Sequence, residues 1–137
     1  MSELDKYTDA IAKAAGTKTF CVLPWIHFAT RPNGDMRLCC SSNASGAGGD
    51  HEVGLVKMNH GKPANFGHET PMEAWNNDYM KNVRTTMLEG NIPASCKKCF
   101  EEEKKGVASK RVWESYTWME DGVDIPELVR QTKEDGT

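Results

Sequence analysis

Residues 95–103 read Ser-Cys-Lys-Lys-Cys-Phe-Glu-Glu-Glu, and the interpretation of the chain starts from the two cysteines in this stretch, Cys96 and Cys99. We expect a helix over residues 96–105 with Ser95 as its cap, and a helix places side chains three positions apart on one face. Both thiols can therefore reach one metal ion or cluster. The positive end of a helix also lowers the pKa of a thiol, and the thiolate is the form that binds metal.

A second pair of cysteines flanks a predicted β-hairpin over residues 25–40. Asn33-Gly34 is a strong signal for a tight turn, because both residues tolerate positive φ. A hairpin brings its two ends together, so we expect Cys21 and Cys39 to lie close in space although they are far apart in sequence.

The fifth cysteine, Cys40, is not expected to share this centre. Neighbouring residues of a strand point to opposite faces of the sheet, so Cys39 and Cys40 would not bind one metal together. Cys40 is interpreted as a small buried apolar residue, which is the usual place of a cysteine outside a disulfide or metal site. The predicted metal ligands are therefore Cys21, Cys39, Cys96 and Cys99.

Two further segments predict helices. Residues 3–15 carry apolar side chains near one face and are followed by a glycine. Residues 71–89 form the clearest helical pattern, with Thr70 and Glu73 placed for a capping box and Gly90 placed as a C-terminal cap.

Together these elements predict a small single domain of the α+β class, in which a β-hairpin is followed by helices and a four-cysteine metal centre pins the fold. A short final helix begins at Ile125, whereas the state of residues 107–118 stays open. We expect an N-terminal helix or extension at residues 1–19, the metal-binding domain at 20–111, and a C-terminal extension or linker at 112–137.

The composition indicates a small protein with a limited hydrophobic core, which a metal centre would stabilise. The chain has 137 residues, of which 38% are hydrophobic and 27% charged, and its mean hydropathy is -0.63. This length corresponds to about one domain, and a diluted core gains stability from a bound metal. The net charge of -3 and the lack of a basic stripe argue against a nucleic-acid-binding protein.

The sequence also indicates where the protein works. We see no apolar run near the roughly 20 residues of a membrane helix and no secretory signal pattern. We therefore expect a cytoplasmic protein whose thiols stay reduced. Five cysteines in such a chain indicate metal binding or catalysis before disulfides.

Other polar residues were weighed as ligands or catalytic groups. Histidine suits zinc, but no histidine stands at a regular ligand spacing from a cysteine. The glutamate run after the second CxxC cysteine, next to lysines, is typical of an exposed helix surface, and arginines are mostly expected at the surface too. These residues are His27, His51, His60 and His68, Glu101, Glu102 and Glu103, and Arg31, Arg37, Arg84 and Arg111.

The pattern of Cys21, twelve residues, Gly34, four residues and Cys39 resembles the opening motif of SPASM and twitch domains, the auxiliary-cluster modules of radical-SAM enzymes. The resemblance covers about residues 20–111. Its other carriers are the stretches Phe20-Cys-Val-Leu-Pro-Trp25, Ala74-Trp-Asn76, Val83-Arg84 to Leu88-Glu-Gly90, and the closing Cys96 to Glu103.

This resemblance implies a twitch-like domain at residues 20–111 with one [4Fe–4S] cluster, since no cysteine follows Cys99. It implies that Cys21, Cys39, Cys96 and Cys99 bind this cluster. The implied function is that of an auxiliary module, for substrate binding or electron transfer, of a radical-SAM enzyme or acting with one. The implied partner is a radical-SAM core in cis or in trans, and peptides are the substrate class that the wider family suggests.

Besides the cluster module, the sequence leaves two other interpretations open, a structural zinc protein and a redox-sensing protein. The chain has no CxxxCxxC triplet, so we do not expect it to be catalytic alone, and whether it forms part of an enzyme stays open. Four thiolates also suit a structural zinc site, which would make the chain an interaction module. A third interpretation is a redox-sensing protein with reactive Cys96 and Cys99.

Overall fold

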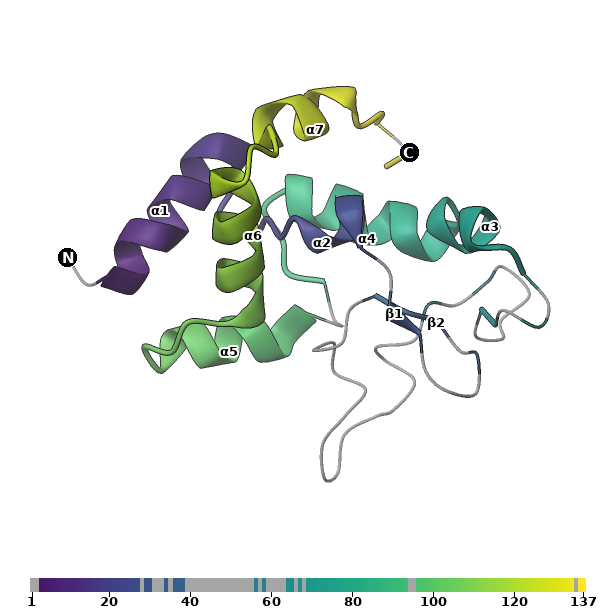
Figure 1. The fold of residues 1–137 in the computed structure, drawn as a ribbon, viewed down its shortest axis with the longest axis horizontal. Coiled ribbons are helices and arrows are strands. Elements are labelled where there is room, and N and C mark those ends of the chain that lie inside the picture. The colour runs from purple at the N-terminus through teal and green to yellow at the C-terminus, as the bar shows by residue number, and fades with distance from the viewer. Residues whose placement is uncertain are drawn as a thin grey trace.

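The computed structural model is mainly helical (Figure 1). Its helices are α1 (Glu3–Ala15), α2 (Leu23–Ile26), α3 (Pro71–Trp75), α4 (Asp78–Leu88), α5 (Lys97–Lys104), α6 (Lys110–Glu120) and α7 (Ile125–Gln131), and its strands are β1 (Ala29–Thr30) and β2 (Met36–Arg37). The residues described are 3–27, 29–30, 34, 36–38, 56, 58, 64–65, 67, 69–93, 96–134 and 136–137.

The predicted α+β class is wrong, and the β-hairpin over residues 25–40 is the main error. Trp25 lies in α2, with Pro24 in the first turn of that helix, where the missing proline N–H costs no hydrogen bond. In the described part, β1 and β2 pair antiparallel over two residues each, with Ala29 opposite Arg37. A short apolar run suits a buried helix turn as well as a strand, and tertiary contacts select the helix here.

The predicted helix over residues 71–89 is in fact two helices. The capping box is confirmed, because the Thr70 side chain accepts a hydrogen bond from the Glu73 amide and the Glu73 carboxylate accepts one from the Thr70 amide. The chain leaves the helix after α3, and Asn77 starts α4 by accepting a hydrogen bond from the Met80 amide at 2.9 Å. The buried Asn77 side chain therefore caps α4 at the break between the two helices.

Helix α6 occupies the middle of the helical assembly (Figure 1), in the region that the sequence left without a prediction. It packs against α1 and α2, and α1 also packs against α7. The core beneath these helices includes Ile11, Phe20, Val22, Met80, Met87, Val112 and Ile125, each almost fully buried. Among the described residues, no helix has the length and apolar character required to cross a membrane.

Arg84 is a buried cation that ties three distant segments together. Its guanidinium donates hydrogen bonds to the carbonyls of Pro24, Trp75 and Gly136 at 3.0, 2.8 and 3.1 Å. It also lies over the Trp75 ring, 4.8 Å from the ring centroid. Burial lowers the pKa of Arg84 to about 10. The expectation that this arginine lies at the surface is therefore wrong.

Candidate metal centre

Helix α5 carries two of the predicted ligands at its N-terminal end. Cys96 is the N-cap residue and Cys99 lies in the first turn, so the predicted helix after the CxxC motif is confirmed. Cys99 is buried, and Cys96 is partly buried against the core. Both residues therefore lie at the N-terminal end of α5, three positions apart in sequence.

Cys21 lies in the buried segment between α1 and α2, and α6 fixes the backbone on both sides of it. Arg111 donates a hydrogen bond to the Phe20 carbonyl at 2.7 Å. The Val22 amide donates a hydrogen bond to the Ser115 hydroxyl at 3.1 Å. Cys21 itself is 7% exposed, so two side chains of one helix hold a buried thiol between them.

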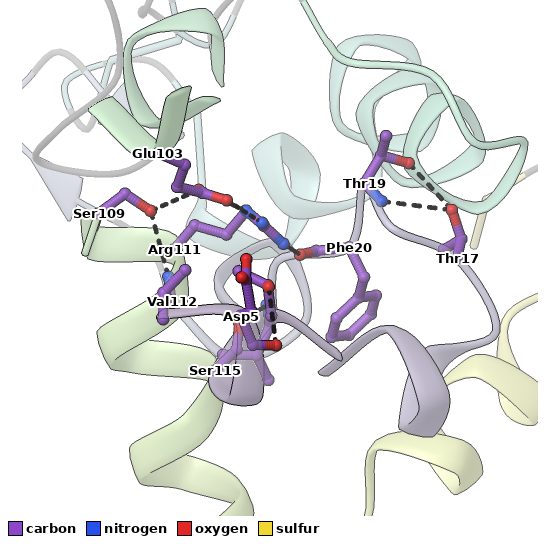
Figure 2. A network of polar contacts seen from close by, with 11 residues as sticks. Asp5, Thr17, Thr19, Phe20, Glu103, Ser109, Arg111, Val112 and Ser115 are labelled. Atoms are coloured by element: carbon purple, nitrogen blue, oxygen red, sulfur yellow. Dashed lines mark hydrogen bonds and ion pairs between the residues drawn. The ribbon is translucent and has the colours of Figure 1, made fainter. Parts of the chain in front are cut away.

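The same arginine reaches α5. Figure 2 shows its guanidinium between the Phe20 carbonyl and the Glu103 carboxylate. Arg111 Nε donates to Glu103 Oε2 at 2.9 Å, a second bond joins Nη2 to Oε1, and the Ser109 hydroxyl donates to Oε2 at 2.6 Å. The guanidinium also lies 4.5 Å from the centroid of the Phe100 ring, next in sequence to Cys99. One buried side chain thus connects the Cys21 segment to the helix of the CxxC motif.

The described structure does not by itself gather a ligand set. Among the residues that it describes, no three histidine, cysteine, aspartate or glutamate side chains form a group able to hold a metal ion. Cys39 and Cys40 lie outside the described residues, so the ligand assignment of Cys39 and the packing role of Cys40 stay predictions. Of the histidines, His27 is described, at the C-cap of α2, and His51, His60 and His68 lie outside.

The comparison with protein families decides what kind of centre this is. The family model of SPASM, an iron–sulfur cluster-binding domain, matches residues 21–100. The chain belongs to this family. Comparison with curated proteins and with solved structures finds no match.

The residues of this SPASM domain fit the chemistry of an iron–sulfur cluster. Such clusters are held by cysteine thiolates, and Cys21, Cys96 and Cys99 are present as thiols within the matched stretch. Burial of Cys21 and Cys99 keeps water away from the sulfur atoms, which is one of the means by which a protein tunes a cluster. The donor set therefore suits the group that the family binds.

The residues that position these thiols were not found from the sequence. Arg111 and Glu103 were both expected at the surface, yet their side chains are 4% and 11% exposed. The sequence does not show which residue a charged side chain will pair with, so the Arg111–Glu103 pair could not be predicted from it. Ser109 was a usable signal, because a serine before an amphipathic run marks a helix start, and its hydroxyl does accept a hydrogen bond from the Val112 amide.

Proposed function

We propose that this SPASM domain carries one [4Fe–4S] cluster and serves as the auxiliary-cluster module of a radical-SAM enzyme, in the same polypeptide or in a separate protein. The observation that carries the proposal is the family match over the stretch that contains all the cysteines. The connection of the Cys21 segment and α5 through Arg111 supports it, because a shared centre needs both segments held to one scaffold.

The proposed ligands are Cys21, Cys39, Cys96 and Cys99. They stand in separate parts of the chain, and metal binding commonly completes the folding of such small domains. A bound cluster would supply an electron-transfer or substrate-binding centre. The chain's own contribution is to bury Cys21 and Cys99, to place Cys96 and Cys99 at the N-terminal end of α5, and to keep the Cys21 backbone in place.

The radical chemistry itself is assigned to the partner. The sequence holds no CxxxCxxC triplet, the motif whose three thiolates leave one iron open to S-adenosylmethionine. The proposed partner is therefore a radical-SAM core, and a peptide is the substrate class proposed for the pair.

The first test is the metal content of the full chain, purified anaerobically and reconstituted with iron and sulfide. We expect about four irons and four sulfides per chain and a broad absorption band at about 400 nm that fades on reduction. Cys21→Ala and Cys96→Ala are expected to remove the iron, and Cys40→Ala is the matched control that keeps it.

Two results would contradict the proposal. One zinc per chain, with no uptake of iron and a colourless sample, would indicate the structural zinc module that four thiolates also allow. Loss of iron in Cys40→Ala but not in Cys39→Ala would overturn the ligand assignment.

A further inference from the structure

A pocket beside α6 has a lining without cysteine, which the proposed cluster function does not use. It measures about 240 Å³ and lies between α6 and Tyr7 of α1. Its polar and aromatic lining includes Trp113, Tyr116, Glu120 and Asp121. The described lining thus combines three aromatic rings with two carboxylates and contains no basic side chain.

The aromatic wall is fixed on one side and open on the other. The Tyr7 and Tyr116 rings contact each other edge to face, with centroids 4.6 Å apart. Trp113 is 64% exposed, so its indole offers a free face to a ligand. A hydrogen bond to Glu120 raises the pKa of Tyr116, which places a carboxylate at the rim of the aromatic wall.

The chain itself shows which group such a wall accepts. Arg111 lies over the Phe100 ring while pairing with the Glu103 carboxylate. Arg84 likewise lies over an aromatic ring, 4.8 Å from its centroid. The pocket repeats the combination of ring and carboxylate seen around Arg111, but the described residues place no cation in it.

We propose that this pocket binds an arginine side chain of a separate polypeptide, with the guanidinium stacked on Trp113 and hydrogen-bonded to Glu120 or Asp121. A guanidinium is planar, so it can lie on an indole and at the same time offer N–H groups to a carboxylate. The two carboxylates of the lining repel an anion. A neutral apolar side chain would offer these carboxylates no hydrogen-bond donor. The charge and shape of the lining therefore select arginine.

The test is a titration of the full chain, as purified, with acetyl-Gly-Arg-Gly-amide. Binding is followed by calorimetry and by the Trp113 indole N–H resonance, which is assigned from the spectrum of Trp113→Phe. Peptides with lysine, norleucine or glutamate in place of arginine are the matched ligands. We expect a saturable shift with the arginine peptide, weaker binding of the lysine peptide and none of the other two.

Variants at the pocket sharpen the test. Trp113→Leu, Glu120→Gln and Asp121→Asn should each weaken binding by about fivefold, and added salt should weaken it further. Trp118→Phe is the control, since Trp118 is also exposed on α6 but does not line the pocket. Unchanged circular dichroism shows that a variant still folds.

Three results would overturn the inference. They are a Trp113 resonance that does not move with the arginine peptide, equal binding of the norleucine peptide, and pocket variants that bind as tightly as the original chain. Free arginine binding more tightly than the peptide would indicate a small organic cation instead of a polypeptide. Because the readout is at Trp113, it is independent of the iron content that tests the cluster.

Discussion

Arg111 is the residue on which the arrangement of the candidate metal centre depends. Its side chain is 4% exposed, and its guanidinium donates hydrogen bonds both to a backbone carbonyl beside Cys21 and to a carboxylate of α5. Burying a charge costs free energy unless the charge has partners. The Nε, Nη1 and Nη2 atoms of Arg111 each donate a hydrogen bond. The attraction between Arg111 and Glu103 therefore adds little net stability, because it is offset by the cost of burying both charges. The main effect of the pair is to fix the relative positions of the Cys21 segment and α5.

Removal of this charge alone should be expensive. Arg111→Met leaves the Phe20 carbonyl without the Arg111 donor and the Glu103 carboxylate without its cation, although the Ser109 hydroxyl still donates to Glu103. We therefore expect the free energy of unfolding to fall by about 3 kcal/mol. Arg111→Met combined with Glu103→Leu removes both charges and should recover part of that loss. Urea unfolding monitored by circular dichroism measures both values.

Lys110→Met provides the matched control for this prediction. Lys110 precedes Arg111 in α6 and pairs with Glu114 at 2.9 Å, but this pair is more exposed. Loss of such a surface pair should cost only about 0.3–0.5 kcal/mol. Similar losses for Lys110→Met and Arg111→Met would show that the Arg111 contact carries no special weight.

The same residue shows how far single positions can be predicted. The spacing of Cys96 and Cys99 predicts a pair of metal ligands, because a helix brings positions three apart to one face, and this ligand assignment stays a prediction. No comparable spacing connects Arg111 with Phe20, which lies 91 positions away in sequence. Contacts of this kind depend on tertiary packing, so they become visible only in the structure.

At the level of elements, local signals predicted helices well and strands poorly. The helices expected at residues 3–15 and 96–105 and from Ile125 onward are confirmed as α1, α5 and α7. Capping residues and periodicity are local, so both can be recognised in the sequence alone. The hairpin prediction over residues 25–40 relied on a turn signal and an apolar run, and an apolar run alone does not distinguish strand from helix.

The break between α3 and α4 gives a prediction for one element. Asn77 is 7% exposed, caps α4 through the Met80 amide, and donates a hydrogen bond from its side-chain amide to the sulfur of Met58 at 3.1 Å. Asn77→Ala should lower the free energy of unfolding by about 1 kcal/mol, the usual cost of a lost N-cap. Chemical denaturation of the full chain measures this difference.

Asn82→Ala is the comparison for that cap, because Asn82 is exposed in the interior of the same helix. Alanine has a higher helix propensity than asparagine, so this change should be neutral or slightly stabilising. If Asn77→Ala were as harmless as Asn82→Ala, the cap would not be what starts α4.

At the scale of the whole molecule, the protein is built mainly from short helices, and these need tertiary contacts to be stable. Most of its helices have between 4 and 11 residues, and isolated helices of this length are unstable in water. Their stability therefore comes from the shared core and from long-range hydrogen bonds such as those of Arg84 and Arg111. A cluster bound by two separate parts of the chain would add a further cross-link.

Iron removal should accordingly lower the stability of the entire protein. We expect anaerobic chelation of the reconstituted chain to reduce the midpoint of thermal unfolding by about 10 °C, the shift that corresponds to roughly 3 kcal/mol for a domain of this size. Differential scanning calorimetry of matched iron-loaded and chelated samples measures it. Identical midpoints would mean that the cluster contributes nothing to the fold.

The hydrogen bonds of α6 to the Cys21 segment and to α5 also define which residues could be transplanted as a unit. Residues 21–100 include every cysteine of the chain, yet a graft limited to them would lose the whole Phe20–Arg111 hydrogen bond and would leave the Val22 amide without its acceptor, Ser115. Buried polar groups without partners cost free energy. The portable piece therefore extends from Phe20 at least as far as Ser115, because its border follows hydrogen bonds and not the outermost cysteines.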